Sequence, residues 1–182
     1  MEIIESSITL DFPDENYFRL CDCNGYKVLQ NNLKEMDVCW FDKTENVLYL
    51  IELKNWDNNN LIEENDSFRS AEEIREIKKR ISEYRIGNLL KKSVDSTCMF
   101  MSILLNTING NKILECSPFK ISEKTDIRLL SIINWNDEDL TYISTINTAY
   151  RSKFNSYARL FNIKSFHVLT KTQAAKIYSW VS

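Results

Sequence analysis

The sequence contains little glycine and proline and a single histidine. Only three Gly and two Pro occur in 182 residues, which excludes long flexible linkers, collagen-like repeats and turn-rich solenoids. No apolar run approaches the roughly 20 residues that cross a bilayer. The first residues are acidic and lack the basic start and apolar stretch of a signal peptide, so we expect a cytoplasmic protein without a membrane partner.

Several common chemical motifs are missing as well. The sequence has no glycine-rich phosphate loop and no G-x-S-x-G, so it does not support a nucleotide hydrolase or a serine hydrolase. The five cysteines show no C-x₂-C spacing, and we expect reduced thiols rather than zinc ligands or disulfides. The lone His167 lies in an apolar stretch, and we expect it to be structural.

What is present is an ordinary globular composition with an uneven charge distribution. Hydrophobic residues make up 43% of the chain and charged residues 27%, which fits one domain over 1–182. Residues 1–66 carry 15 acidic and 5 basic side chains, whereas residues 140–182 carry six basic and no acidic ones. An acidic half can gather cations and a basic half can face an anionic polymer, or the two can neutralise each other in the fold.

Apolar runs predict the strands of the domain. Asn-Gly at 24–25 predicts a hairpin between strands at 17–22 and 26–30, because both residues tolerate positive φ. Aromatic and aliphatic residues predict strands at 36–41 and 47–54, joined by a polar turn. Further strands are predicted at 98–105, 112–116, 127–135 and 166–169, with a turn at 109–111.

Apolar residues spaced by three and four predict two long helices. Ile74, Ile77 and Ile81 indicate a helix over 70–94. An S-x-x-E capping box, Ser70 to Glu73, marks its start.

The second long helix is predicted over 137–161, with Asn136 as its cap. Thr170 then opens a short final helix with Gln173 as the capping partner. The resulting order predicts an α/β fold, a central mixed β-sheet flanked by helices. Its core spans about 17–105, and residues 106–182 extend the same domain.

The most informative residues are Asp37, Glu52 and Lys54. A hairpin with its turn near 44–45 places Asp37 opposite Glu52, with Cβ atoms about 5 Å apart. Glu52 and Lys54 differ by two positions, so they share a face of their strand. Charges at the end of an apolar strand are costly to desolvate, and they persist when they are paired or ligated.

This set of groups has a specific chemistry. Two neighbouring carboxylates repel unless a cation lies between them, and hard oxygen ligands suit Mg²⁺. The backbone carbonyl of Leu53 can add a third oxygen. A bound metal lowers the pKa of its water and neutralises charge on a phosphate. Lys54 would orient the attacking water or stabilise the pentacovalent phosphorane.

Asp37 followed after a gap of fourteen by Glu52-Leu53-Lys54 resembles the PD-(D/E)xK nuclease superfamily, which has the restriction-endonuclease-like fold. The resemblance implies an endonuclease that hydrolyses nucleic acid, more often DNA than RNA, with Mg²⁺ or Mn²⁺, and often as a homodimer. It implies that Asp37 and Glu52 are metal ligands and that Lys54 assists the water. Met36 stands where the family often has Pro.

The resemblance also implies an additional acidic ligand, for which the candidates are Glu5, Glu15 and Glu35. Two other interpretations remain open. Asp37, Glu52 and Lys54 could form a solvated ion cluster of little energetic consequence. Alternatively, the chain could be a non-catalytic nucleic-acid-binding or regulatory module on the same fold, which would bind without divalent metal.

Basic residues on the helix over 70–94 indicate a phosphate-binding face. In the first turns, glutamates at helical spacing can instead pair with the basic groups on a solvated surface. The predicted nucleic-acid-binding residues are Lys78, Lys79, Arg80, Arg85, Lys91 and Lys92.

Overall fold

Five strands form the central sheet in the computed structural model, which describes residues 2–29, 32–56, 70–135 and 140–182. The first three strands in the spatial order β3-β4-β5-β6-β7 are antiparallel neighbours, and β5, β6 and β7 run parallel. The sheet is therefore mixed, as predicted. The strands are β3 (Tyr17–Phe18), β4 (Val38–Asp42), β5 (Val47–Asn55), β6 (Asp126–Asn134) and β7 (Ser165–Thr170).

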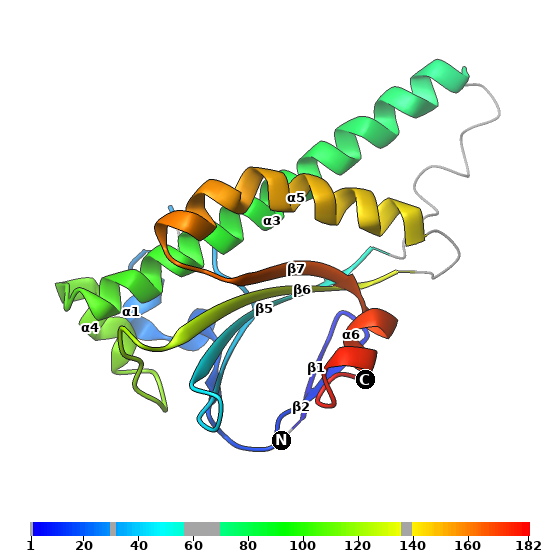
Figure 1. The fold of residues 1–182 in the computed structure, drawn as a ribbon. Coiled ribbons are helices and arrows are strands. Elements are labelled where there is room, and N and C mark those ends of the chain that lie inside the picture. Colours follow the sequence, from blue (N-terminus) through cyan, green and yellow to red (C-terminus); the bar gives the residue numbers. More distant parts are fainter. Residues whose placement is uncertain (1, 30–31, 57–69, 136–139) are drawn as a thin grey trace.

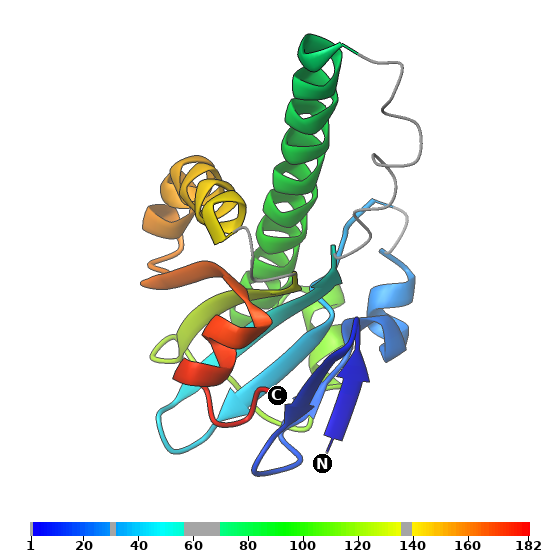
Figure 2. The same cartoon turned by 90° about the vertical axis from the view of Figure 1, so that its right-hand side faces the viewer.

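A hydrophobic core lies on each face of the sheet, so the central strands are buried on both sides. Helices α3 (Ala71–Leu104) and α5 (Leu140–Leu160) cover one face (Figure 1). The hairpin of β1 (Glu2–Glu5) and β2 (Ile8–Asp11), together with α6 (Lys171–Ile177), covers the other (Figures 1 and 2). Alternate residues of β5 belong to the two cores, and this alternation turns Glu52 toward the helices.

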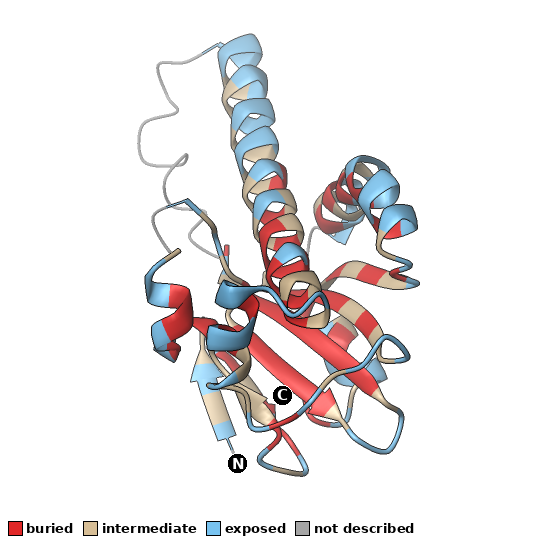
Figure 3. Ribbon diagram, turned by 90° about the vertical axis from the view of Figure 1, so that its left-hand side faces the viewer, coloured by how far each residue is buried: buried red, intermediate tan, exposed pale blue. Residues whose placement is uncertain are grey.

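Helix α3 begins at the predicted capping box but runs ten residues beyond the predicted end at 94. The strand predicted at 98–105 is wrong, because these residues form the last turns of α3. Met99, Phe100 and Ile103 are buried there, and this spacing suits a helix. A short apolar run cannot distinguish a strand from a buried helix, and residues 88–105 contain no Gly or Pro that would end the helix. Figure 3 shows burial concentrated in this C-terminal half of α3.

The predicted hairpin at 24–25 is wrong too. A 3₁₀ helix, η1 (Leu20–Asp22), and helix α1 (Asn24–Lys27) occupy that segment. A Cβ added to Gly25 would lie 2.4 Å from the carbonyl oxygen of Lys112, so this glycine permits the close approach of two helices rather than a turn.

The turn predicted at 109–111 and the strand predicted at 112–116 are also wrong, because helix α4 (Ile108–Leu114) occupies most of this segment. Here too a glycine permits two helices to approach closely. Gly110 packs against the backbone of Ser102 in α3, where an added Cβ would lie 2.2 Å from the carbonyl oxygen. Thr107 caps α4 by accepting a hydrogen bond from the N–H of Gly110 at 3.0 Å.

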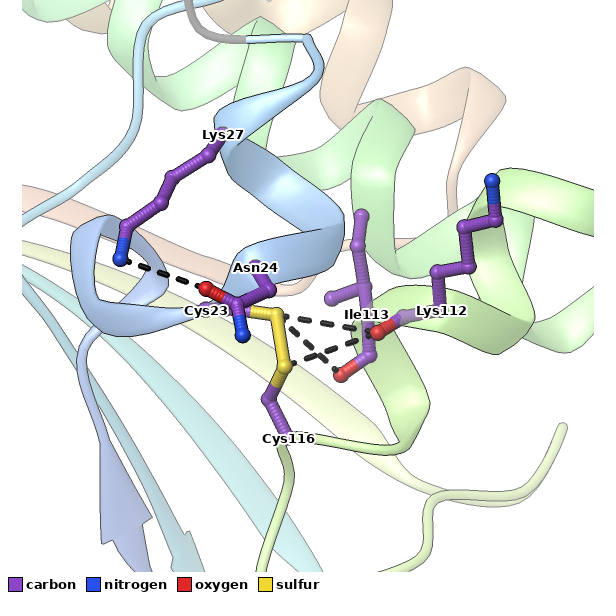
Figure 4. The surroundings of a disulfide bond; sticks show 6 residues. All are labelled: Cys23, Asn24, Lys27, Lys112, Ile113 and Cys116. Atoms are coloured by element: carbon purple, nitrogen blue, oxygen red, sulfur yellow. Dashed lines mark hydrogen bonds between the residues drawn. A yellow bond between two sulfur atoms is a disulfide. The ribbon is translucent and has the colours of Figure 1, made fainter.

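A disulfide joins Cys23 to Cys116 (Figure 4). The expectation of five reduced thiols is therefore wrong for this pair, whereas Cys21, Cys39 and Cys98 are free. The two bonded cysteines are 93 residues apart in sequence, and only the packing of α1 against α4 brings them together. Sequence spacing could not reveal such a contact.

The C-terminal elements follow the predictions. Helix α5 and strand β7 agree with the predicted helix and strand to within a few residues, although Asn136, the predicted cap, lies outside the described residues. Thr170 and Gln173 form the predicted capping box of α6. Among the described helices, none is both long and apolar enough to cross a membrane.

Candidate functional site

The β4–β5 hairpin brings Asp37 and Glu52 together. Val38 pairs with Ile51 in the antiparallel register, so Asp37, one residue before β4, lies opposite Glu52 as predicted. The N–H of Leu53 donates a 2.8 Å hydrogen bond to Asp37 Oδ2. This bond fixes the Asp37 carboxylate beside the end of β5.

Helix α3 holds the chain that enters β4. Asp95 Oδ2 accepts a hydrogen bond from the N–H of Lys34 at 2.8 Å, and Ser96 Oγ accepts one from the N–H of Met36 at 2.8 Å. The segment before Asp37 is therefore anchored to the buried half of α3. The position of the first carboxylate depends on helix packing as well as on the hairpin.

The same half of α3 supplies a lysine that joins the two carboxylates. Lys92 Nζ lies 3.0 Å from Asp37 Oδ1 and 2.8 Å from Glu52 Oε2. Two carboxylate oxygens from neighbouring strands thus converge on one cationic nitrogen. We predicted Lys92 as a nucleic-acid contact, and the structure places it inside the acidic pair.

Lys54 completes the cluster from the strand side. Its Nζ lies 2.7 Å from Glu52 Oε1 and 3.5 Å from Asp37 Oδ2. It also donates a 3.1 Å hydrogen bond to the carbonyl oxygen of Leu53. Glu52 Oε1 is buried, and its partner among the described residues is the ammonium group of Lys54. We refer to Asp37, Glu52, Lys54 and Lys92 as the acidic-lysine cluster.

Burial sets the protonation of this cluster. The Glu52 side chain is 1% exposed, and desolvation raises its pKa to about 7, with the charge of Asp37 adding to the rise against the effect of the two lysines. Desolvation acts on Asp37 as well. The ammonium groups of Lys92 and Lys54 and the N–H of Leu53 outweigh it, so the pKa of Asp37 lies below its usual value.

Lys92 responds in the opposite sense to an isolated buried lysine. Desolvation favours its neutral form, but the carboxylates of Glu52 and Asp37 outweigh that effect and raise the pKa of Lys92. The lysine therefore stays charged. The arrangement stabilises positive charge at the point between the two carboxylates.

The turn between β1 and β2 lies against the site. Ser6 and Ser7 both have positive φ, 56° and 59°, and they form the two-residue turn between Glu5 and Ile8. Ser6 Oγ donates a 3.2 Å hydrogen bond to the carbonyl oxygen of Leu53, the predicted third ligand. Two consecutive non-glycine residues with positive φ are uncommon, and they are found where tertiary contacts hold them.

The three candidates for an additional acid have different surroundings. Glu5 pairs with Arg19, whose Nη2 lies 2.5 Å from Glu5 Oε2. Glu35 accepts a hydrogen bond from the hydroxyl of Tyr26, and Glu15 is exposed. In the described part of the chain, none of the three forms a hydrogen bond or ion pair with Asp37 or Glu52, although the Arg19 guanidinium interacts electrostatically with both Glu5 and Asp37.

The predicted basic face of α3 is divided among several environments. Lys78, Lys79 and Arg80 are exposed, and for them nucleic-acid contact stays a prediction. Lys91 pairs with Asp95 at 2.8 Å. Arg85 makes intramolecular contacts instead, and it lies over the rings of Trp56, Trp135 and Tyr142 at 4.6, 5.5 and 5.7 Å.

Sequence reasoning missed Ser131 as a neighbour of Glu52. The two residues are partners in the parallel register of β5 and β6, so their side chains share the face that α3 covers. The Ser131 hydroxyl is buried and has no hydrogen-bond partner among the described residues. No local motif could have indicated it, because 79 positions separate the two residues.

The donors of the cluster fit a hard divalent cation. No group of three or more His, Cys, Asp or Glu side chains is placed for metal binding in the described ranges, so the available set is two carboxylates and the Leu53 carbonyl. Mg²⁺ commonly uses one or two carboxylates and keeps several waters. Such an ion would need Lys92 to move from between the two carboxylates.

Comparison with known proteins gives no family. No protein-family model matches the chain, and no curated protein or solved structure matches it either. A functional interpretation therefore depends on the geometry of the acidic-lysine cluster.

Proposed function

We propose that this chain is a divalent-metal-dependent phosphodiesterase that hydrolyses nucleic acid, with a restriction-endonuclease-like fold of the PD-(D/E)xK type. One observation carries the proposal: Asp37 Oδ1 and Glu52 Oε2 converge on a single cationic nitrogen at 3.0 and 2.8 Å. Lys54 lies 2.7 Å from the same glutamate. Burial of a carboxylate pair and its adjacent lysines at a strand end costs desolvation free energy. A catalytic role explains why the chain keeps these charges there.

Each residue of the cluster has a distinct role in this proposal. Asp37 and Glu52 would hold Mg²⁺ or Mn²⁺, with the Leu53 carbonyl as a third oxygen ligand. The bound cation supplies charge neutralisation for the phosphate and a water of lowered pKa. Lys54 would orient the attacking water toward phosphorus, and Lys92 would contact the phosphate once it no longer bridges the two carboxylates. Attack would join the water oxygen to phosphorus and break the bond from phosphorus to the 3′ oxygen, so that one product carries a 5′-phosphate and the 3′ oxygen takes up a proton and leaves as a hydroxyl.

The order of elements supports the proposed fold. The antiparallel pair β4–β5 carries Asp37 and the E-x-K residues, helix α3 follows, and β6 then pairs in parallel with β5. Strands β5 and β6 are parallel neighbours, and the chain crosses from one to the other through α3. This connection is a β-α-β unit. The site lies at the carboxyl end of β5, where open α/β sheets commonly bind ligands.

A second function is favoured by one specific contact. Lys92 bridges both carboxylates, so the cluster is neutralised by two lysines without any metal. A module with this arrangement would bind nucleic acid without turnover and without regard to divalent cations. The exposed basic residues of α3 would serve either function.

Cleavage assays separate the two functions. We would incubate the protein with plasmid, single-stranded DNA and RNA in Mg²⁺, Mn²⁺ or EDTA, beside Glu52→Gln and Lys54→Met. We expect metal-dependent cleavage that both variants reduce by at least 100-fold, the lower end of what one catalytic group contributes. Glu45→Gln and Lys120→Met, at exposed positions away from the cluster and from α3, are the matched controls and should retain activity.

The product ends give an independent check, because labelled products should carry 5′-phosphates. Absence of cleavage on every substrate, with binding that EDTA and both site variants leave unchanged, would establish the non-catalytic module instead. Cleavage that survives in Glu52→Gln would place the active site elsewhere.

A further inference from the structure

The backbone of β5 extends past the end of β4 at the acidic-lysine cluster. Pairing of β4 with β5 ends at Ile51 on the cluster side, and side chains then bond to the backbone of Leu53. Its N–H donates a 2.8 Å hydrogen bond to Asp37 Oδ2. Its carbonyl oxygen accepts two hydrogen bonds, from Lys54 Nζ at 3.1 Å and from Ser6 Oγ at 3.2 Å. This oxygen is the third ligand in the proposed function.

The two donors to the Leu53 carbonyl differ in what else holds them. A carbonyl oxygen has two lone pairs, so one donor has to leave before the oxygen can act as a metal ligand. Lys54 also pairs with Glu52 at 2.7 Å, and it can therefore give up the carbonyl and stay in the cluster. Ser6 reaches the cluster through this oxygen and can keep its lone pair. A donor in that position orients the ligand.

The backbone of Ser6 has a conformation that serine seldom adopts. Ser6 and Ser7 have φ angles of 56° and 59°, and they form the two-residue turn between Glu5 and Ile8. The sequence Asn-Gly is preferred in such turns, because both central residues need positive φ. Local preference therefore does not select serine here. Such residues persist where tertiary contacts hold them, and the hydrogen bond from Ser6 to Leu53 is one such contact.

Other contacts hold the same hairpin in place. Lys171 Nζ donates a 3.0 Å hydrogen bond to the carbonyl oxygen of Ser7, and Figure 1 shows the turn beside α6. In β2, the N–H of Thr9 donates a 2.8 Å hydrogen bond to the carbonyl oxygen of Ser182. The position of the hairpin therefore does not depend on the Ser6 hydroxyl alone, and loss of that hydroxyl is a local change.

We propose that Ser6 is a positioning residue of the metal site, whose hydroxyl orients the Leu53 carbonyl as a ligand of the cation in the acidic-lysine cluster. The inference rests on the proposed function, because that function makes the carbonyl a ligand. Ser6 itself contacts neither the cation nor the substrate. Once Lys54 gives up the carbonyl, its ammonium group is free to contact the attacking water.

Two glycine substitutions in the same turn test this role. Ser6→Gly removes the hydroxyl and Ser7→Gly keeps it, while both place at positive φ a residue that adopts it without steric cost. Each variant would be titrated with Mn²⁺, with free Mn²⁺ measured by electron paramagnetic resonance. We expect Ser6→Gly to weaken Mn²⁺ binding about tenfold, the lower end of the loss that removal of such an outer partner causes. Ser7→Gly should bind Mn²⁺ as the unsubstituted protein does.

Further variants separate the hydroxyl from general effects. Ser6→Asn tolerates positive φ and carries an N–H donor, so it should bind Mn²⁺ more tightly than Ser6→Gly. Glu52→Gln defines the Mn²⁺ that binds outside the cluster. In cleavage assays, the Mn²⁺ concentration that gives half of the maximal rate should rise about tenfold in Ser6→Gly, and thermal unfolding in EDTA shows that every variant is folded.

Equal Mn²⁺ affinities of Ser6→Gly and Ser7→Gly would overturn the positioning role and leave the proposed function in place. Tighter Mn²⁺ binding by Ser6→Gly would overturn it too, because the hydroxyl would then compete with the cation for the carbonyl. Binding by Ser6→Asn no tighter than by Ser6→Gly would show that the donor is not what matters. If the unsubstituted protein binds no more Mn²⁺ than Glu52→Gln, the proposed metal site itself fails, and the role of Ser6 fails with it.

Discussion

The two halves of helix α3 carry similar charged residues but use them differently. In the N-terminal half, Lys78, Lys79 and Arg80 are exposed, and Arg80 forms an i,i+4 pair with exposed Glu76 at 3.3 Å. In the C-terminal half, Lys92 is largely buried and bridges Asp37 and Glu52. Figure 3 shows the change from exposed to buried along the helix. A lysine on a helix thus acquires a specific role through burial, since an ion pair in water contributes little.

The largest expected effect comes from the buried lysine. Lys92→Met leaves two buried carboxylates with only Lys54 to compensate them, and we expect the free energy of unfolding to fall by about 3 kcal/mol. Lys79→Met removes the same charge from the exposed half, and its effect should stay within about 0.5 kcal/mol. Urea unfolding of the two variants measures the difference. Equal effects would show that the cluster does not depend on Lys92.

Divalent cations sharpen this comparison. If Asp37 and Glu52 hold Mg²⁺, the ion should stabilise Lys92→Met by about 2.7 kcal/mol at 100 times its dissociation constant. Lys79→Met should gain less, because Lys92 still competes for the same oxygens. Unfolding curves of Lys92→Met that coincide in Mg²⁺ and EDTA would argue against the metal site.

An intermediate effect is expected for Arg85, near the boundary of the two halves. It lies over three aromatic rings and donates a 3.0 Å hydrogen bond to the hydroxyl of Tyr142 in α5. Arg85→Met should lower the free energy of unfolding by about 1–2 kcal/mol. Arg80→Met, on the exposed side, should change it by no more than about 0.5 kcal/mol. Thermal and urea unfolding would both report this, and similar losses would mean that the rings do not hold Arg85.

The smallest effect concerns Gly87, between the two halves of α3. Its φ is not positive, and an added Cβ would meet no atom within 4 Å. Gly87→Ala should raise the free energy of unfolding by about 0.5–1 kcal/mol, because alanine restricts the unfolded chain and favours the helix. Gly110→Ala should instead destabilise the protein through its contact with Ser102. A loss of stability in Gly87→Ala would indicate a packing contact that the structure lacks.

Local signals predicted several elements correctly. The β4–β5 hairpin, its register and the capping boxes of α3 and α6 involve residues close together in sequence. The errors lie where packing overrides local preference. At Gly25 and Gly110, a glycine that suggests a turn permits two helices to touch, and residues 98–105 form a helix because one side of α3 is buried there.

The sequence by itself determined that Asp37, Glu52 and Lys54 meet, because the turn at the hairpin sets their register and alternation along β5 sets their face. Tertiary structure alone decided that Lys92 joins them, 40 residues from Glu52 and 55 from Asp37 in sequence. It also decided that Ser6 contacts Leu53, that Ser131 lies beside Glu52, and that Cys23 bonds to Cys116. These contacts depend on how helices and hairpins pack on the sheet, and packing is not encoded in the spacing of any short segment.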